Sequence, residues 1–453
     1  MRRWLLALGA LVVLGLGSWS AWSLFWRIEA PIRVGILHSR TGPLAISEQA
    51  MADAELLAIE EINQAGGILG RRVEPVIADG RSDPKVFAQE ARRLIEVEKV
   101  SVLFGCWTSL SRRAVKEVVE STGHLLFFPS NYEGMDIPSG VICTGPIPNQ
   151  QVIPAVNWCY ETLKARKFFL AGSKDIQAYS SNALVKDQLK AIGAQLVGEK
   201  YVELDGAGTA EMVASIKAAA PDVVLSTVVG EGNKPFYLQM AQAGLTPARL
   251  PVVSFTIGEN ELRELPLKEM VGGYAAWSYF QSLEDPVNRA VVRRFKEKYG
   301  AERPTGDAIV AAYNAVHLWA KAVDEAETAV AAEVRKFAVR ASLEAPEGVI
   351  SVDADSLHTW RPFYIGRIRQ DGQFDVAWSL DKPVRPVPFP ALRSRLEWEA
   401  FVEKLYTTWG TNEFNPQTLN GPDPAPPALA RRAARVAPPP SLSSSRQIKP
   451  YQR

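Results

Sequence analysis

The segment VSVLFGCWTSLSRRAV, residues 100–115, contains the change of pattern on which the predicted fold depends. Its apolar run from Val100 to Phe104 predicts a buried strand that ends at Gly105. Trp107 and three hydroxyl residues follow, and a basic helix is expected from about Ser109. A strand that passes directly into a helix is the repeating unit of a parallel sheet, so the segment predicts an α/β fold.

The same alternation of apolar runs and amphipathic segments continues on both sides of this stretch. IRVGILH at 32–38 is typical of a buried strand, and the alternation resumes with KFFLAG at 167–172, after the linker-like GPIPNQQVIPA at 145–155. Two such units in succession predict two Rossmann-like lobes, each a parallel sheet flanked by helices, with a cleft between them. Residues 348–378 instead predict an antiparallel hairpin with Asp371-Gly372 as its turn.

These patterns also predict where the domains begin and end. We expect the first lobe at residues 31–145, with a return segment at about 260–325. The second lobe is expected at 146–259 with a segment at about 326–390, followed by a C-terminal helix at 391–410. Residues 411–453 are rich in proline and arginine, which predicts a disordered tail rather than a packed element.

The N-terminal residues 1–30 are typical of a signal peptide or a membrane anchor. Two arginines precede an uncharged stretch from Trp4 to Trp26. This stretch exceeds the ~7–15 residues of a secretory h-region and reaches the ~20 of a spanning helix, which favours an anchor through residues 4–26. Small residues at Ser18 and Ser20 leave cleavage open. Both alternatives predict a periplasmic or otherwise extracytoplasmic body, because the leading arginines favour the cytoplasmic side.

Composition excludes several classes of partner and cofactor. The formal net charge is +1 and charged residues make up 22% of the chain, which does not predict nucleic-acid binding. The three cysteines, Cys106, Cys143 and Cys159, have no metal-ligand spacing. We favour buried free thiols, although one disulfide and a spare thiol remain open. No metal and no cofactor is therefore expected.

Motifs of catalysis are also missing from the sequence. No G-x-S-x-G, H-E-x-x-H or Walker A pattern occurs, and the four histidines are widely separated. A triad can assemble from residues that are far apart in the chain, so an enzyme is not excluded on this ground alone. The prediction is nevertheless a binding protein without catalytic residues.

The expected strand ends predict where a ligand binds. In open parallel sheets, ligands occupy the crevice beyond the carboxyl ends of the strands. These ends are rich in Ser, Thr, Gly and Asn and poor in Lys and Arg, which predicts a small, polar, nearly neutral ligand. Thr108 and Ser109 would offer hydroxyl and amide donors to a carbonyl oxygen at a helix N-terminus. The alternatives are that Ser109 is a plain helix cap and that Trp107 belongs to the core.

Several segments, taken together and in order from about Ile32 to Phe389, are similar to those of one known family. They resemble the urea-binding component of urea ABC transporters and, equally, its relative, the short-chain amide receptor that controls an amidase operon. The segments that carry the resemblance are VGILHSRTGPLAISE, FGCWTSLSRRAV, FFPSNYEG, GPIPNQQVIPA, STVVGEGN, YAAWSYFQS and HTWRPFYIGRIRQDGQFDVAW. The resemblance implies the type I periplasmic-binding-protein fold, with two lobes joined by three crossovers that close on the ligand.

The resemblance also implies a set of ligand-binding residues. The family's aromatic residue falls on Trp107 and its amide-binding serine on Ser109. The remaining matched positions are Ser130 and Tyr132 in the first lobe and Glu231 and Thr256 in the second. A tyrosine pair that encloses the amide in relatives is replaced here by Asp175 and Gln177, while Tyr179 is out of register. This departure predicts a smaller and more polar second wall and leaves the ligand open.

The functional prediction is an extracytoplasmic solute-binding protein that captures urea or a short-chain amide and delivers it to an ABC permease and ATPase. Closure of two lobes, without chemistry, would be the mechanism. The alternatives are a branched-chain amino acid-type binding protein and a membrane-tethered amide sensor. A cytoplasmic amide-responsive regulator is disfavoured by the N-terminal segment.

Overall fold

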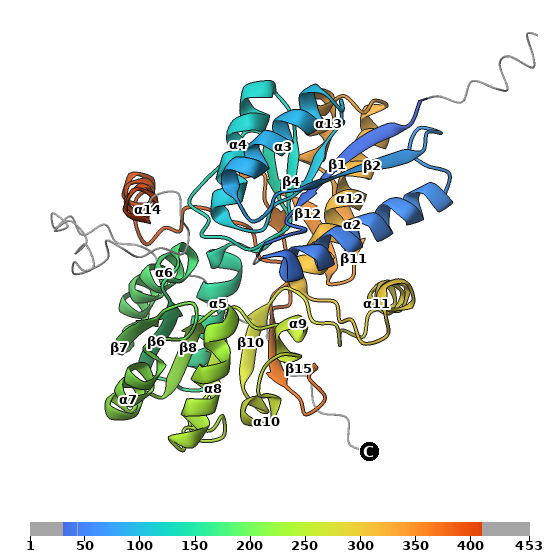
Figure 1. The fold of residues 1–453 in the computed structure, drawn as a ribbon. Helices are drawn as coiled ribbons and strands as arrows, with labels where there is room; N and C mark the ends of the chain where they lie inside the picture. Colours follow the sequence, from blue (N-terminus) through green and yellow to red (C-terminus); the bar gives the residue numbers. More distant parts are fainter. Residues whose placement is uncertain (1–29, 43, 410–453) are drawn as a thin grey trace, which may run out of the picture.

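The computed structural model describes residues 30–42 and 44–409, which form two α/β lobes, one above the other in Figure 1. The predicted anchor through residues 4–26 and the predicted tail at 411–453 lie outside the described residues. Among the residues described, no helix has the length and apolar character needed to cross a membrane. The two lobes confirm the predicted α/β fold class.

The first lobe is built on a parallel sheet of five strands in the order β2-β1-β3-β4-β5. Short apolar runs make β1, β3, β4 and β5 buried almost throughout, as expected of a sheet covered by helices, whereas the edge strand β2 is partly exposed. The strands are β1 (Ile32–His38), β2 (Val73–Asp79), β3 (Leu103–Gly105), β4 (Leu126–Phe128) and β5 (Val141–Cys143). Its helices include α2 (Ala45–Gln64), α3 (Pro84–Glu96) and α4 (Ser109–Thr122).

The second lobe contains a sheet of seven strands in the order β15-β14-β10-β9-β8-β6-β7. Five of its strands are parallel: β6 (Lys167–Ser173), β7 (Gln195–Val202), β8 (Val223–Thr227), β9 (Val252–Ser254) and β10 (Tyr274–Trp277). The hairpin of β14 (Tyr364–Ile368) and β15 (Phe374–Ser379) adds to β10 in the antiparallel direction. Its turn contains Asp371 and Gly372, at the position predicted from the sequence.

Helices cover both faces of this second sheet (Figure 1). They are α5 (Pro148–Glu161), α6 (Ile176–Ile192), α7 (Thr209–Ala219) and α8 (Asn233–Gln242), with the short η1 (Gly230–Gly232), α9 (Glu259–Leu262) and α10 (Leu267–Met270) between strands. Two buried clusters of apolar side chains lie on the two sides of the sheet. The carboxyl ends of β6, β8 and β9 therefore hold the second-lobe residues that the sequence marked as ligand-binding.

The return segments between the lobes agree with the expected ones only in part: α12 (Asp307–Ala326) lies in the first lobe and the β14–β15 hairpin in the second, but other elements do not. Residues 260–325 were assigned to the first lobe, but β10 pairs with β9 and so belongs to the second sheet. Residues 326–390 were assigned to the second lobe, but α13 (Ala331–Ala338) and β12 (Gly348–Val352) pack into the apolar core of the first lobe, and β12 forms a separate three-stranded sheet with β11 (Ser342–Ala345) and β13 (Thr359–Trp360). The physical reason is α12, whose apolar face packs on α2 and carries the following elements with it.

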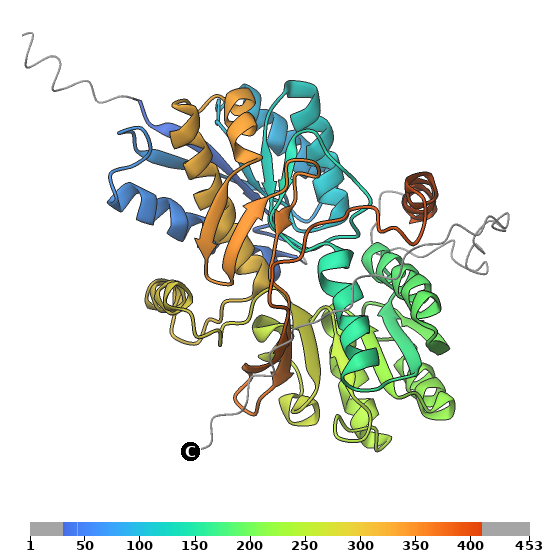
Figure 2. The ribbon, with the colours of Figure 1, turned by 180° about the vertical axis from the view of Figure 1, so that it is seen from behind.

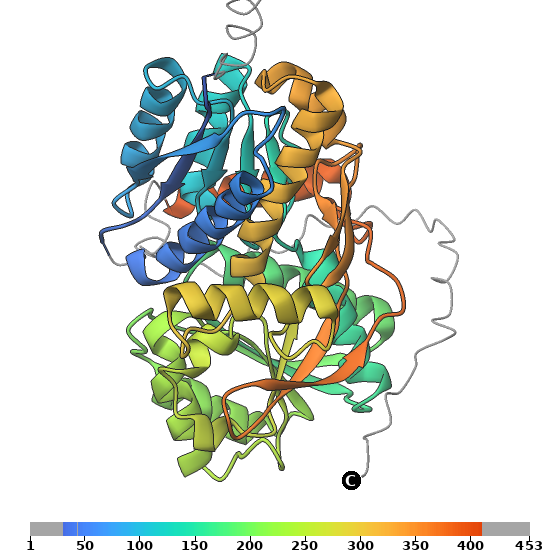
Figure 3. The ribbon, with the colours of Figure 1, turned by 90° about the vertical axis from the view of Figure 1, so that its right-hand side faces the viewer.

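Three chain segments connect the lobes, and a buried ion pair ties them together. Arg361, which is fully buried, donates from Nη1 to the carbonyl oxygen of Thr144 at 2.6 Å and from Nη2 to Asp307 Oδ2 at 3.0 Å. The backbone N–H of Ser278 donates to the same Asp307 oxygen at 3.1 Å. Thr144, Ser278 and Arg361 each lie just beyond the end of a strand where the chain changes lobe. Figure 3 shows the third connection, the orange segment that descends from the first lobe into the second.

Two further helices lie close to the boundary between the lobes. They are α11 (Pro286–Tyr299) and α14 (Arg395–Trp409), the last described element of the chain. In Figures 1 and 2, α14 stands at the edge of the molecule, beside α4 of the first lobe and α6 of the second. The three cysteines are all buried and none forms a disulfide, as favoured from the sequence.

Candidate functional site

The passage from β3 to α4 is fixed by backbone geometry. Gly105 has φ +145°, and a Cβ at this position would lie 1.9 Å from the carbonyl oxygen of Leu37, so only glycine fits. Thr108 is the residue that caps the helix, because its side-chain oxygen accepts a hydrogen bond from the Ser111 N–H at 3.1 Å. The alternative that Ser109 is the plain helix cap is therefore wrong, and its hydroxyl has another role.

Ser109 is buried and its hydroxyl donates to Oε2 of Glu133, in the loop that follows β4. Oε1 of the same carboxylate accepts from the hydroxyl of Tyr406 on α14 and lies 3.5 Å from Nη2 of the buried Arg112. The expectation that the Ser109 hydroxyl donates to a ligand carbonyl is corrected by this contact, because its proton is committed to Glu133. A hydroxyl oxygen has two lone pairs, so Ser109 can act towards a ligand as an acceptor.

Tyr132, predicted to contact the ligand, has its side chain directed into the interior. It is fully buried, its hydroxyl lies 2.6 Å from Nε2 of His358, and the two rings stack. Burial lowers the pKa of His358 to about 4, so its imidazole is neutral, and its Nδ1 lies 2.6 Å from the Ser356 carbonyl. With Nδ1 donating to that carbonyl, Nε2 accepts from Tyr132. Tyr132 therefore joins the β4 loop to the segment before β13, which is a structural role.

The other first-lobe residues lie close to the same strand ends. Trp107 is half-buried and packs against the apolar core of the first lobe, so the core alternative accounts for part of its surface. Ser130 is buried directly beyond β4, and a Cβ on Gly145 would lie 2.1 Å from its carbonyl oxygen. This close approach joins the end of β4 to the first connection between the lobes.

In the second lobe, Asp175 holds the strongest electrostatic feature among the predicted site residues. It is the N-cap of α6, where Oδ1 accepts from the Ala178 N–H at 2.8 Å. Its other oxygen, Oδ2, is buried and has no hydrogen-bond partner among the described residues. Burial raises the pKa of this carboxyl to about 7, against the opposing hydrogen bonds from the helix N-terminus. A buried carboxylate oxygen without a partner is suited to accept an N–H from a ligand.

The remaining second-lobe residues predicted for the site differ in their exposure and in their hydrogen bonds. Gln177 is half-buried in the first turn of α6, and Thr256 donates its hydroxyl to the Val228 carbonyl oxygen at 2.5 Å. Glu231 is exposed in η1, and no side-chain hydrogen bond to another described residue holds it towards the lobe boundary. Tyr179 stacks on Tyr201 with ring centroids 4.0 Å apart. An aromatic pair is therefore present in this lobe, but it comes from α6 and β7 rather than from the expected positions.

Two polar residues of the site were not assigned from the sequence. Glu133 lies within the matched segment FFPSNYEG, directly after Tyr132, and was given no role. Tyr406 lies 273 positions further along the chain, and no local pattern indicates that it reaches Glu133. With Arg112, they line a groove of about 330 Å³ between α4, the β4 loop and α14, whose lining does not include Ser109.

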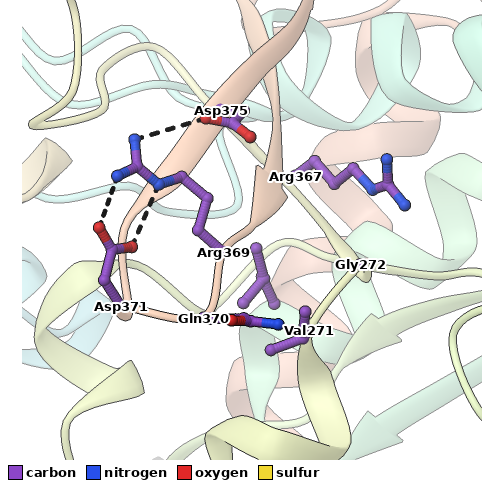
Figure 4. Close-up of a pocket in the computed structure, with 8 residues that line it drawn as sticks. Val271, Gly272, Arg367, Arg369, Gln370, Asp371 and Asp375 are labelled. Carbon is purple, nitrogen blue, oxygen red and sulfur yellow. Dashed lines mark hydrogen bonds and ion pairs between the residues drawn. The ribbon is translucent and has the colours of Figure 1, made fainter.

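A second surface hollow lies away from these residues. Figure 4 shows it at the turn of the β14–β15 hairpin, where Arg369 pairs with Asp371 at 2.5 Å and with Asp375 at 3.4 Å. Its lining includes Val271 and Gly272, which precede β10, so it lies at the amino end of that strand. None of the predicted ligand-binding residues lines it. Within residues 30–42 and 44–409, no group of three or more His, Cys, Asp or Glu is arranged to hold a metal ion.

A buried cluster of charged side chains lies at the end of β1. His38 is buried between Glu48 and Glu55, with nitrogen–oxygen distances of 3.3 and 3.1 Å. Burial lowers the pKa of His38, but the two carboxylates outweigh this effect and raise it to about 10. The imidazole is therefore charged at neutral pH and joins the strand end to α2. This role is structural, since the cluster is fully buried.

Comparison with known proteins places the chain among solute-binding proteins. A family model described as a periplasmic binding protein domain matches residues 32–395. The leucine-, isoleucine-, valine-, threonine-, and alanine-binding protein of Pseudomonas aeruginosa is 24% identical over 330 residues, which cover 71% of this chain and 86% of that protein. An amino acid binding protein of the same organism is 25% identical, over 54% of this chain and 64% of its own length. A limonene hydroxylase of Geobacillus stearothermophilus is 28% identical over 121 residues, and the chain spans 22% of it.

Solved structures show the same fold. The solute-binding protein of an ABC transporter from Rhodopseudomonas palustris, in complex with 3,4-dihydroxybenzoic acid, superposes with a TM-score of 0.71 at 20% identity, covering 79% of this chain and 98% of that chain. The substrate-binding protein of a branched-chain amino acid transporter from Streptococcus pneumoniae, in complex with isoleucine, gives 0.68 at 21% identity, covering 79% of this chain and 100% of that chain. At these identities, the likeness establishes the fold alone.

Proposed function

The chain belongs to the periplasmic binding protein family, and we propose that it captures a small solute with N–H groups between its two lobes for delivery to an ABC permease and ATPase. The family is one of transport rather than catalysis, and its location is extracytoplasmic. Urea or a short-chain amide is the solute that we propose. A membrane anchor at residues 4–26 remains a prediction from the sequence.

The observation that carries this proposal is the pair of acceptors at the two strand edges. Ser109 in the first lobe has its proton committed to Glu133, and Asp175 in the second lobe has a buried oxygen without a hydrogen-bond partner in the described part of the chain. Acceptors recognise N–H donors, and an uncompensated buried carboxylate repels an anion. A urea or amide edge offers such donors, whereas a benzoate anion does not.

An amino acid is the second candidate, and the names of two relatives favour it. Its ammonium group would suit the same acceptors, but its carboxylate would need donors. Thr108 uses its side-chain oxygen within the helix cap, so this oxygen already has a partner. The two candidates therefore differ in whether the first lobe also binds a carboxylate.

Ligand size limits the affinity to be expected. Urea has about four non-hydrogen atoms, and the best very small ligands gain roughly 1.5 kcal/mol per atom. The resulting value of about −6 kcal/mol corresponds to a Kd on the order of tens of µM. An amino acid has more atoms and more charge, so it can bind more tightly.

Titration calorimetry on the full chain tests the proposal. The panel is urea, formamide, acetamide, leucine, alanine and benzoate, each added to the ligand-free protein. We expect saturable binding of urea or an amide and none of benzoate. Heat from the amino acids alone would replace the amide assignment by an amino acid one, and heat from benzoate alone would contradict both.

A further inference from the structure

The helix α14 is anchored on the second lobe by apolar packing. Trp398 is fully buried in the cluster that includes Ile176 and Leu184 of α6. The guanidinium of Arg393, just before the helix, pairs with Asp187 of α6 at 2.5 Å and lies 4.4 Å from the Trp398 ring. These contacts make α14 a part of the second lobe in its packing.

The contacts of α14 with the first lobe are different in kind. Tyr406 donates its hydroxyl to Glu133, and the guanidinium of Arg113 lies 3.8 Å from the Tyr406 ring. Arg113 also pairs with Glu403 at 3.6 Å. Met135 and Leu110 of the first lobe also pack with the apolar cluster that contains Trp398, so the polar and aromatic contacts add to an apolar one. The same helix therefore touches both lobes, and Figures 1 and 2 show it beside α4 and α6.

Glu133 is the point at which this helix meets the candidate site. Its carboxylate is 1% exposed and accepts hydrogen bonds from Ser109 on one oxygen and from Tyr406 on the other. Arg112 supplies the nearby positive charge, but it is shared with Asp136 at 2.8 Å. The two hydroxyl donors thus complete the environment of a buried charge, and losing either leaves that charge under-satisfied.

We propose that Glu133 and Tyr406 are positioning residues that determine the specificity of the solute site. The second lobe carries α14, Tyr406 holds Glu133, and Glu133 fixes the proton of Ser109 so that the serine oxygen accepts an N–H from the solute. The site then prefers solutes with N–H groups over solutes that offer only a carbonyl oxygen. The specificity part rests on the proposed function, whereas the link between Ser109 and α14 does not.

Two solutes of nearly equal shape separate positioning from simple structural support. Acetamide and acetone differ in an amino group against a methyl group, so only acetamide can donate to Ser109. We expect the full-length wild-type protein to bind acetamide at least about tenfold more tightly than acetone. In Glu133→Gln, the new amide can donate to the serine oxygen, and this ratio should fall about tenfold. Tyr406→Phe should lower the ratio by about threefold, because Glu133 keeps its charge and only loses a donor.

A second measurement works without any ligand. Hydrogen exchange of the amides in residues 395–409 should be faster in Tyr406→Phe and in Glu133→Gln than in the wild type, by about tenfold. The matched control is Tyr299→Phe, which removes a tyrosine hydroxyl that donates to the Asp53 carbonyl oxygen, away from α14. The control should leave both the exchange in α14 and the solute ratio unchanged.

The outcomes distinguish the two proposals. If the wild type binds no solute of the panel, the proposed function fails, and the exchange of α14 alone decides whether Glu133 and Tyr406 hold it. If the wild type binds acetamide but Glu133→Gln and Tyr406→Phe leave the acetamide-to-acetone ratio unchanged, the positioning role is wrong while the proposed function stands. An equal fall in both affinities assigns a purely structural role and also overturns the inference.

Discussion

Glu133 in the first lobe and Asp175 in the second are both buried carboxylates beside a helix N-terminus, yet they are treated differently by their surroundings. Both oxygens of Glu133 accept hydrogen bonds from hydroxyl groups, and Arg112 lies beside it. Only one oxygen of Asp175 has a partner among the described residues, and burial raises the pKa of that carboxyl to about 7. The carboxylate of the first edge is thus satisfied by protein groups, whereas under the proposed function the carboxylate of the second edge is completed by the solute.

Removing the organised carboxylate should have the largest effect on stability. Glu133→Ala leaves the buried Arg112 with only Asp136 and leaves two hydroxyl donors without their acceptor. We expect the free energy of unfolding to fall by about 3–5 kcal/mol, as for other broken buried pairs. Differential scanning calorimetry of the ligand-free protein measures this change. A loss within the range of an ordinary surface substitution would show that Glu133 is not held as described.

Replacing the carboxyl of Asp175, which has only one hydrogen-bonded oxygen among the described residues, should instead raise the free energy of unfolding at high pH. The pKa of Asp175 in the folded protein, about 7, lies above the ordinary value of 3.8, so the folded state binds this proton more tightly than the unfolded chain does. Stability from the protonated carboxyl is present below about pH 4 and is lost as the pH rises to about 7. Asp175→Asn keeps a good helix cap and should raise the free energy of unfolding at pH 8 by about 2–4 kcal/mol.

The same calorimetric scans at pH 4, 6 and 8 provide the control for this effect. The difference between Asp175→Asn and the wild type should shrink as the pH falls towards 4, where the native carboxyl is protonated. A difference that is the same at all three values would mean that the substitution acts through packing and not through charge.

Two substitutions with smaller effects distinguish the helix cap Thr108 from the proposed acceptor Ser109 at the start of α4. Ser109→Ala should weaken solute binding about tenfold, because a hydrogen bond of about 1.4 kcal/mol is lost, and it should also lower stability because Glu133 loses one donor. Thr108→Ala should instead cost about 1 kcal/mol of stability and keep the affinity, because Thr108 is the cap. Calorimetric titration and thermal unfolding of both variants give the two readouts. If Ser109→Ala lowered only stability and Thr108→Ala lowered only affinity, Ser109 would be the helix cap.

The strand–helix alternation was enough to predict the α/β fold and the strand ends at which the candidate site residues lie. Local periodicity indicates which residues face a core, and this pattern was enough to predict β3, α4 and β6. The return segments were assigned correctly only in part, for α12 and for the β14–β15 hairpin, because strand order depends on pairing between distant segments. Nothing in the local sequence shows that β10 pairs with β9 or that α12 carries β12 to the first lobe.

The candidate site was likewise predicted only in part. Ser109 and Asp175 were predicted as ligand-binding because each stands where a strand ends and a helix begins, and this role stays a prediction. Tyr132 was interpreted as a ligand contact, but its partner His358 lies 226 positions away and draws it into the interior. Tyr406 was missed for the same reason, since side-chain pairs across such distances leave no periodic pattern. The exposure of Glu231 likewise depends on how η1 sits in the fold.

The central claim is that the two edges accept the N–H groups of one solute, and the pH dependence of affinity tests it most directly. An N–H donor binds the ionised form of Asp175, so affinity should rise with pH as this carboxyl loses its proton near pH 7. Between pH 6 and pH 8 we expect about a tenfold gain in the affinity for acetamide, since the competent fraction rises by that factor. In Asp175→Asn the affinity should be independent of pH over this interval. A wild-type affinity that is flat or falls with rising pH would contradict the claim.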